Sequence, residues 1–92
     1  MAQGSLERFR AWLEAQGLGP ADAAWLTEVY ARVGQRLQGP LGLGVGMEGG
    51  RLWVYLHVPD RTGGLRLAFD QIKRLEDPVG ELEDLVLRQL LA

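Results

Sequence analysis

Apolar residues recur at helical spacing through the first forty positions of the chain. In the first segment these residues are Leu6, Phe9, Trp12 and Leu13. Ser5 precedes them as a candidate N-cap and Gly17 follows as a C-terminal stop, which predicts a helix over about 5–16. A second helix is predicted from Pro20, a residue that suits the first helical turn, to the residue before Gly39.

The period of the pattern then changes to two residues, which is typical of strands. Apolar residues alternate with glycines up to Met47, and a second alternating run covers 51–58. Between these runs Glu48-Gly49-Gly50-Arg51 fits a two-residue hairpin turn, because glycine tolerates the positive φ of primed turns. On one face this register pairs Leu41 with Val58, Leu43 with Leu56, Val45 with Val54, and Met47 with Leu52. On the other face it pairs Gly42 with His57, Gly44 with Tyr55, and Gly46 with Trp53, so that rings cover bare backbone.

A third strand is predicted over 65–69, after a loop at 59–64. Continuing the register with Val58 opposite Leu65 places Arg66 beside His57. The same register places Ala68 beside Tyr55 and Asp70 beside Trp53.

The last quarter of the chain reads as two helical segments. Residues 70–76 are predicted to form a short turn, and Asp77-Pro78 to cap and open a final helix. We therefore expect one α+β domain over 1–92, with two N-terminal helices, a three-stranded antiparallel meander, a short helix and a C-terminal helix (αα-βββ-αα).

Composition fits one small soluble domain. The chain has 92 residues, 47% of them hydrophobic and 24% charged, with a net charge of -2. Having no cysteine and one histidine, it lacks disulfides, thiol nucleophiles and any multi-histidine metal site. No apolar run is long enough to span a membrane, so we expect no membrane partner. The absence of cysteine favours a cytoplasmic protein. Arginine in place of lysine and the absence of asparagine suggest a GC-rich genome, and we expect a bacterial source.

Two motifs have simple structural explanations. Gly44-x-Gly46-x-x-Gly49 matches the dinucleotide fingerprint formally, but that motif joins a strand to a helix, whereas here a helix precedes and a strand follows. Five acids within 76–84 could attract a divalent cation, yet acids also favour the positive end of the predicted last helix. We expect neither a cofactor nor a metal site.

The second sheet face carries the candidate site, which consists of Trp53, Tyr55, His57 and Arg66. Rings on strands beside arginine could stack the bases of a single-stranded nucleic acid. They could equally be covered by a helix or by another subunit, because Trp, Tyr and Arg are enriched at protein interfaces. His57 is the only histidine of the chain and therefore its only candidate for a general base of that type.

The predicted order α-β-β-β-α over roughly 20–91 resembles the double-stranded-RNA-binding domain and the HicA-type toxin ribonucleases in topology. In the first family lysines begin the last helix, whereas this chain has Asp77-Pro78-Val79-Gly80-Glu81, which would repel phosphate. In the second family a strand histidine is catalytic. His57 is the possible match, although the family's Gly-Ser-His sequence is absent.

The width of the sheet limits how many helices can cover one of its faces, and this bears on the expected function. A three-stranded sheet is roughly 14 Å wide and accepts about one and a half helices on a face. With three apolar helices, one of them should cover the glycine and aromatic face, or a second copy should extend the sheet. We expect a non-catalytic protein-interaction or structural module, as a homodimer or bound to another protein, with Trp53, Tyr55 and Arg66 as anchors alongside Phe9 and Trp12. A single-stranded nucleic-acid binder and a HicA-like ribonuclease using His57 are the alternatives.

Overall fold

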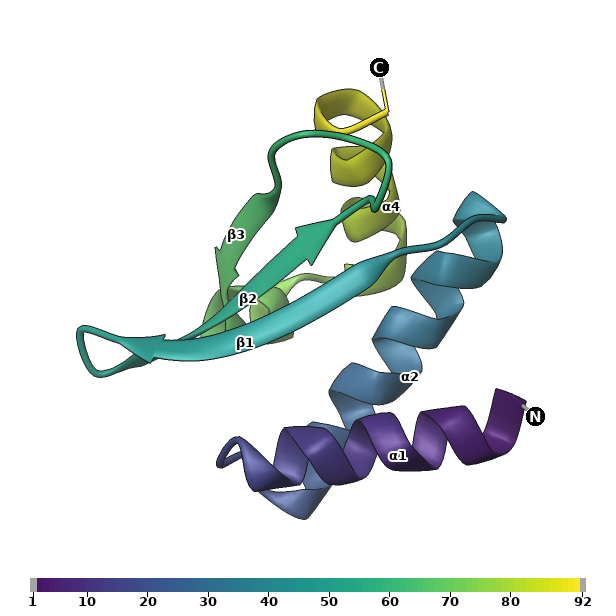
Figure 1. The fold of residues 1–92 in the computed structure, drawn as a ribbon. Coiled ribbons are helices and arrows are strands. Elements are labelled where there is room, and N and C mark those ends of the chain that lie inside the picture. Colours follow the sequence, from purple (N-terminus) through teal and green to yellow (C-terminus); the bar gives the residue numbers. More distant parts are fainter. Residues whose placement is uncertain (1, 92) are drawn as a thin grey trace.

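The computed structural model describes residues 2–91, with side chains from residue 5 onward. Its elements are α1 (Ala2–Ala15), α2 (Pro20–Leu37), β1 (Gly42–Glu48), β2 (Arg51–His57), β3 (Leu65–Ala68), α3 (Phe69–Arg74) and α4 (Pro78–Gln89). This is the predicted α+β order of two helices, three strands, a short helix and a last helix (Figure 1).

Most helix ends follow the local signals in the sequence. Gly17 adopts a φ of 108° after α1, Pro20 opens α2, and the Asp77 carboxylate accepts a hydrogen bond from the Gly80 amide at 3.1 Å. The prediction for Ser5 was wrong, because α1 begins at Ala2 and Ser5 therefore lies inside the helix. A serine cap is a preference of about 1 kcal/mol, and here the helix continues past it through Gly4 to Ala2 and Gln3, two residues with good helix propensity.

The hairpin of β1 and β2 has the predicted register. Glu48 lies opposite Arg51, Val45 opposite Val54, and Gly42 opposite His57. Gly49 and Gly50 have φ values of 62° and 77°, the two positive values that a type I′ turn requires. The right-handed twist of such a turn matches that of the strands, so the two glycines determine which residues face each other.

The register of β2 with β3 was predicted wrongly by two residues. Leu65 lies opposite Leu56 rather than Val58, because Val58 is used elsewhere: its carbonyl accepts a hydrogen bond from the Arg61 amide at 2.9 Å in a turn. The chain then passes so close to β2 that a Cβ atom on Gly64 would lie 3.0 Å from the Leu56 carbonyl oxygen. Since side chains alternate with a period of two, the shift leaves each residue on its predicted face.

The correct register changes which side chains meet on the face of Trp53. Arg66 pairs with Tyr55, and Ala68 pairs with Trp53, so neither has the partner that we expected. His57 has no partner on β3, which begins opposite Leu56. Asp70 is not in the sheet, because β3 ends at Ala68 and α3 begins at Phe69.

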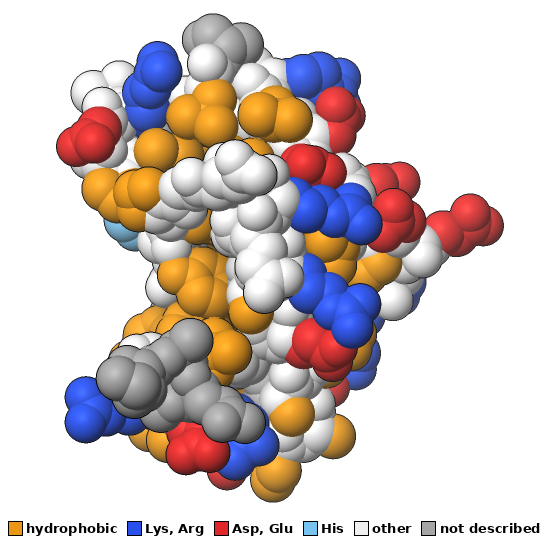
Figure 2. Space-filling model, turned by 90° about the vertical axis from the view of Figure 1, so that its right-hand side faces the viewer, with side chains coloured by type: hydrophobic (Ala, Val, Ile, Leu, Met, Phe, Trp, Pro, Cys, Tyr) orange, Lys and Arg blue, Asp and Glu red, His pale blue; other side chains and the backbone are white. Residues whose placement is uncertain are grey.

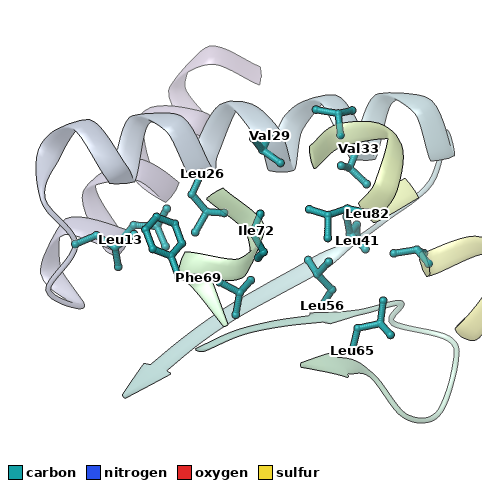
Figure 3. Packing of buried hydrophobic residues seen from close by; sticks show 14 of the residues in the cluster. Leu13, Leu26, Val29, Val33, Leu41, Leu56, Leu65, Phe69, Ile72 and Leu82 are labelled. Atoms are coloured by element: carbon teal, nitrogen blue, oxygen red, sulfur yellow. The ribbon is translucent and has the colours of Figure 1, made fainter. Parts of the chain in front are cut away.

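The core lies between one face of the sheet and the helices. Figure 3 shows Leu26, Val29 and Val33 of α2 packed toward Leu56 of β2 and Leu82 of α4. These five residues are buried, so the apolar face of the hairpin carries the main hydrophobic contact of the molecule. Ion pairs reinforce it at the surface, where Arg36 joins α2 to Glu83 of α4 and Lys73 joins α3 to Asp22 of α2. Basic and acidic side chains are accordingly interspersed on the helix side in Figure 2.

The sheet face is too narrow for three helices, and α1 avoids this limit in a way that we did not expect. It packs against α2 and contributes the fully buried Leu13, while Phe9 stacks on Tyr30 of α2 with ring centroids 4.7 Å apart. It therefore covers neither face of the sheet. In the part of the chain that the structure describes, all helices lie on the same side of the sheet (Figure 1). No helix among residues 2–91 is both long and apolar enough to cross a membrane.

Candidate functional site

The candidate site is the sheet face opposite the helices, which we call the open face. The residues of this face that concern the candidate site come from all three strands. These residues are Gly42, Gly44, Gly46, Trp53, Tyr55, His57 and Arg66. Trp53 and Tyr55 are half-buried although no described helix covers them, whereas His57 and Arg66 are exposed. The structure brings Trp53, Tyr55 and Arg66 together and leaves His57 at the other end of β2.

Trp53 is the centre of a cluster held by arginine side chains. The Arg66 guanidinium lies 3.8 Å from the Trp53 ring centroid, and the Arg51 guanidinium lies 5.3 Å from it, both within the range of cation-π attraction. The ring nitrogen of Trp53 donates a hydrogen bond to the Glu48 carbonyl at 3.1 Å. Trp53 thus leans toward the hairpin turn and ties it to the sheet.

Each arginine of this cluster has its own acidic partner. Arg66 Nη2 lies 3.0 Å from Glu48 Oε1, and Arg51 Nη2 lies 2.9 Å from Asp70 Oδ1. The hydrogen bond from Arg51 lowers the pKa of Asp70 below its ordinary value, so this carboxylate stays ionised over a wider acidic range. The positive charges on this end of the open face are therefore balanced by neighbours from the same chain.

The aromatic side chains cover the glycines unevenly. A Cβ atom on Gly42 would lie 2.1 Å from His57 Nε2, which means that the imidazole rests directly on the Gly42 backbone. A Cβ atom on Gly46 would lie 3.6 Å from Tyr55 Cε2, so Tyr55 covers the glycine diagonal to it rather than its partner Gly44. Gly44 has nothing within 4 Å of its Cβ position and is the bare point between the two rings.

His57 lacks the neighbouring group that would orient it for catalysis, within the described residues. Its side chain is exposed, and no hydrogen bond or ion pair within residues 5–91 orients its imidazole. A general base is normally held by a second group that fixes its tautomer and orientation. The contact with Gly42 gives His57 a sufficient structural role.

Sequence reasoning allowed a second copy to extend the sheet but did not say which edge strand it would join. The strand order is β1-β2-β3, so β1 pairs on one side only within the described chain. Edge strands are normally protected by proline or by charged residues. From Gly42 to Met47, β1 has neither. Met47 is 66% exposed, making it the most exposed of the large apolar side chains that the structure describes. The unbroken alternation of apolar residues and glycine was the available signal.

The other residues singled out in the sequence have local roles. Phe9 packs on Tyr30, whereas Trp12 beside it is 39% exposed. In the acidic segment Asp77 caps α4, and Asp84 pairs with Arg88 on the same helix at 2.7 Å. Within residues 5–91 no three histidine, aspartate or glutamate side chains are grouped so that they could bind one metal ion.

Comparisons with protein-family models, with curated proteins and with solved structures found no match to the chain.

Proposed function

We propose that this chain is a small non-catalytic protein-interaction module that forms a homodimer through its sheet. The unprotected β1 edge carries this proposal. An edge strand offers a row of unpaired amides and carbonyls to another strand, and natural proteins usually block long apolar edges with lysine, proline or a bulge. Here the six residues of β1 from Gly42 to Met47 are left unblocked, and the apolar side chain of Met47 is exposed to solvent.

Charge at the open face favours a protein over a nucleic acid. A base that stacked on Trp53 would have to displace Arg66, which lies over the ring and is paired with Glu48. Since Arg51 is likewise paired with Asp70, neither arginine offers phosphate an uncompensated charge. Binding of a single-stranded oligonucleotide at low salt, with a change in Trp53 fluorescence, would support the alternative function.

The proposed homodimer can be tested with two matched substitutions. Met47→Lys places a charge on the β1 edge, and Leu87→Lys places one on α4 at a second exposed apolar residue, which is 46% exposed. Sedimentation velocity should find a dimer for the wild type and for Leu87→Lys. Met47→Lys should sediment mainly as a monomer, because lysine on an edge strand opposes pairing.

A wild-type protein that stays monomeric at every concentration would overturn the proposed homodimer. A dimer that persists equally in both variants would show that association uses a surface other than the β1 edge. Circular dichroism of both variants supplies the folding control, since exposed substitutions of this kind usually change stability by less than about 0.5 kcal/mol.

A further inference from the structure

We infer that two copies of the chain join β1 to β1 in an antiparallel pairing centred on Val45, which would continue the sheet from one copy into the other. The inference rests on the proposed homodimer and adds its register. It follows from three properties of β1: the direction of its free backbone groups, the order of its side chains and the position of its charge.

The hairpin turn determines which backbone groups of β1 are free. Glu48 and Arg51 close the type I′ turn as a hydrogen-bonded pair, and bonded and non-bonded pairs alternate along an antiparallel ladder. The amides and carbonyls directed away from β2 are therefore those of Leu43, Val45 and Met47. A second β1 strand must align these three residues with the same three residues of its own.

Centring the two-fold axis on Val45 uses all of these groups. Val45 then faces Val45 of the second copy, and Leu43 faces Met47 in both directions, with each pair exchanging two hydrogen bonds. Moving the two-fold axis toward Met47 would require the turn glycines, which have positive φ values and are not extended, to pair with the second strand. Moving it toward Leu43 requires Leu41, whose carbonyl already accepts a hydrogen bond from the Tyr30 hydroxyl.

The side chains of β1 are self-complementary in this register. On the helix side, the exposed Met47 would lie against the half-buried Leu43 of the second copy, removing apolar surface from water. On the open face, Gly44 would lie opposite Gly46, so no side chains collide. Glu48, the only charged residue of the strand, would face Gly42, so no like charges oppose each other.

The register can be tested by disulfide formation, because the chain has no cysteine of its own. Gly44→Cys and Gly46→Cys are suitable variants: a Cβ atom at Gly44 meets nothing within 4 Å, and one at Gly46 meets only the Tyr55 ring at 3.6 Å. In the inferred pairing, positions 44 and 46 of different copies form a non-hydrogen-bonded pair with Cα atoms about 4.5 Å apart, within disulfide range. The same position in the two copies lies diagonally, at about 7–8 Å, which is beyond that range.

Mild oxidation of a mixture of the two single variants should therefore yield a covalent dimer. Each variant oxidised alone should yield several-fold less.

Efficient self-crosslinking of Gly44→Cys alone would place the axis at residue 44, and that of Gly46→Cys alone would place it at residue 46. Either result would overturn the inferred register. A wild-type dimer whose variants, still dimeric by sedimentation, crosslink in no combination would also overturn it while leaving the proposed homodimer intact. A monomeric wild type would instead remove the homodimer itself.

Discussion

The side chain of Tyr30 links the two N-terminal helices to the start of the sheet. Tyr30 connects three segments: its ring stacks on Phe9 of α1, its backbone belongs to α2, and its hydroxyl donates a hydrogen bond to the Leu41 carbonyl just before β1. Burial raises the pKa of the Tyr30 hydroxyl above its ordinary value of 10.0. The protonated form is therefore the one that stabilises the folded state.

Tyr30→Phe should lower the free energy of unfolding by about 1 kcal/mol at neutral pH, because it leaves the Leu41 carbonyl without this donor while keeping the ring contact with Phe9. Since the folded-state pKa is raised, the wild-type advantage is fully present below pH 10.0. It should be lost as the pH rises through the raised value. Urea denaturation of both proteins at neutral and alkaline pH measures this difference. Equal stability of the two proteins at neutral pH would contradict the assigned hydrogen bond.

Among the elements, the β1–β2 hairpin is the best determined by its sequence. Its turn needs two consecutive residues with positive φ, and Gly49 and Gly50 meet this need without steric cost. Trp53 adds a second restraint at the same end of the hairpin through its bond to the Glu48 carbonyl. The turn therefore determines the register of the whole strand pair.

Gly50→Ala should destabilise the protein by about 1–2 kcal/mol, because an L-residue is strained at a φ of 77° although there is space for its Cβ atom. Gly44→Ala is the matched control. Its Cβ position is equally open, but its backbone lies in a strand, where alanine is no worse than glycine. Thermal unfolding should separate the two variants. Similar losses in both would mean that backbone strain at the turn is not the cause.

The same hairpin shows how far the sequence could predict this fold. The register of β1 with β2 was predictable because a two-residue turn leaves no freedom in which residues face each other. The register of β2 with β3 was not, because an alternating pattern looks the same after a shift of two residues. The choice between Val58 and Leu56 as the partner of Leu65 depended on the turn at Val58, which no apolar pattern reveals. Trp53, Tyr55 and Arg66 were correctly assigned to one face, but the arginine contact with Trp53 followed only from the actual register.

At the scale of the whole molecule, the helices leave one of the two faces of the sheet uncovered. Counting helices against sheet width predicted that the open face or an edge would need a cover, and overlooked that α1 could pack on α2 instead. Helices bury apolar stripes against each other as readily as against a sheet, so the number of helices does not determine how many faces are covered. Within the described chain, both the open face and the β1 edge are therefore left without a cover.

The proposed homodimer predicts that the stability of the molecule depends on its concentration. The melting temperature of the wild type should rise as the protein is concentrated, because association favours the folded state by mass action. That of Met47→Lys should stay constant. Differential scanning fluorimetry over a dilution series measures both trends. A wild-type melting temperature that does not change with concentration would argue against coupling between folding and association.

The three tryptophans give this small chain an optical reporter in each of its layers. Trp12 is partly exposed on α1, Trp25 meets Phe69 edge-on between α2 and α3 at 5.8 Å, and Trp53 lies beneath a guanidinium on the sheet. Emission from Trp12 is sensitive to water, whereas that from Trp53 depends on the charged group above it. Replacing the tryptophans one at a time would therefore assign any spectral change to the outer helix, the core or the strand surface.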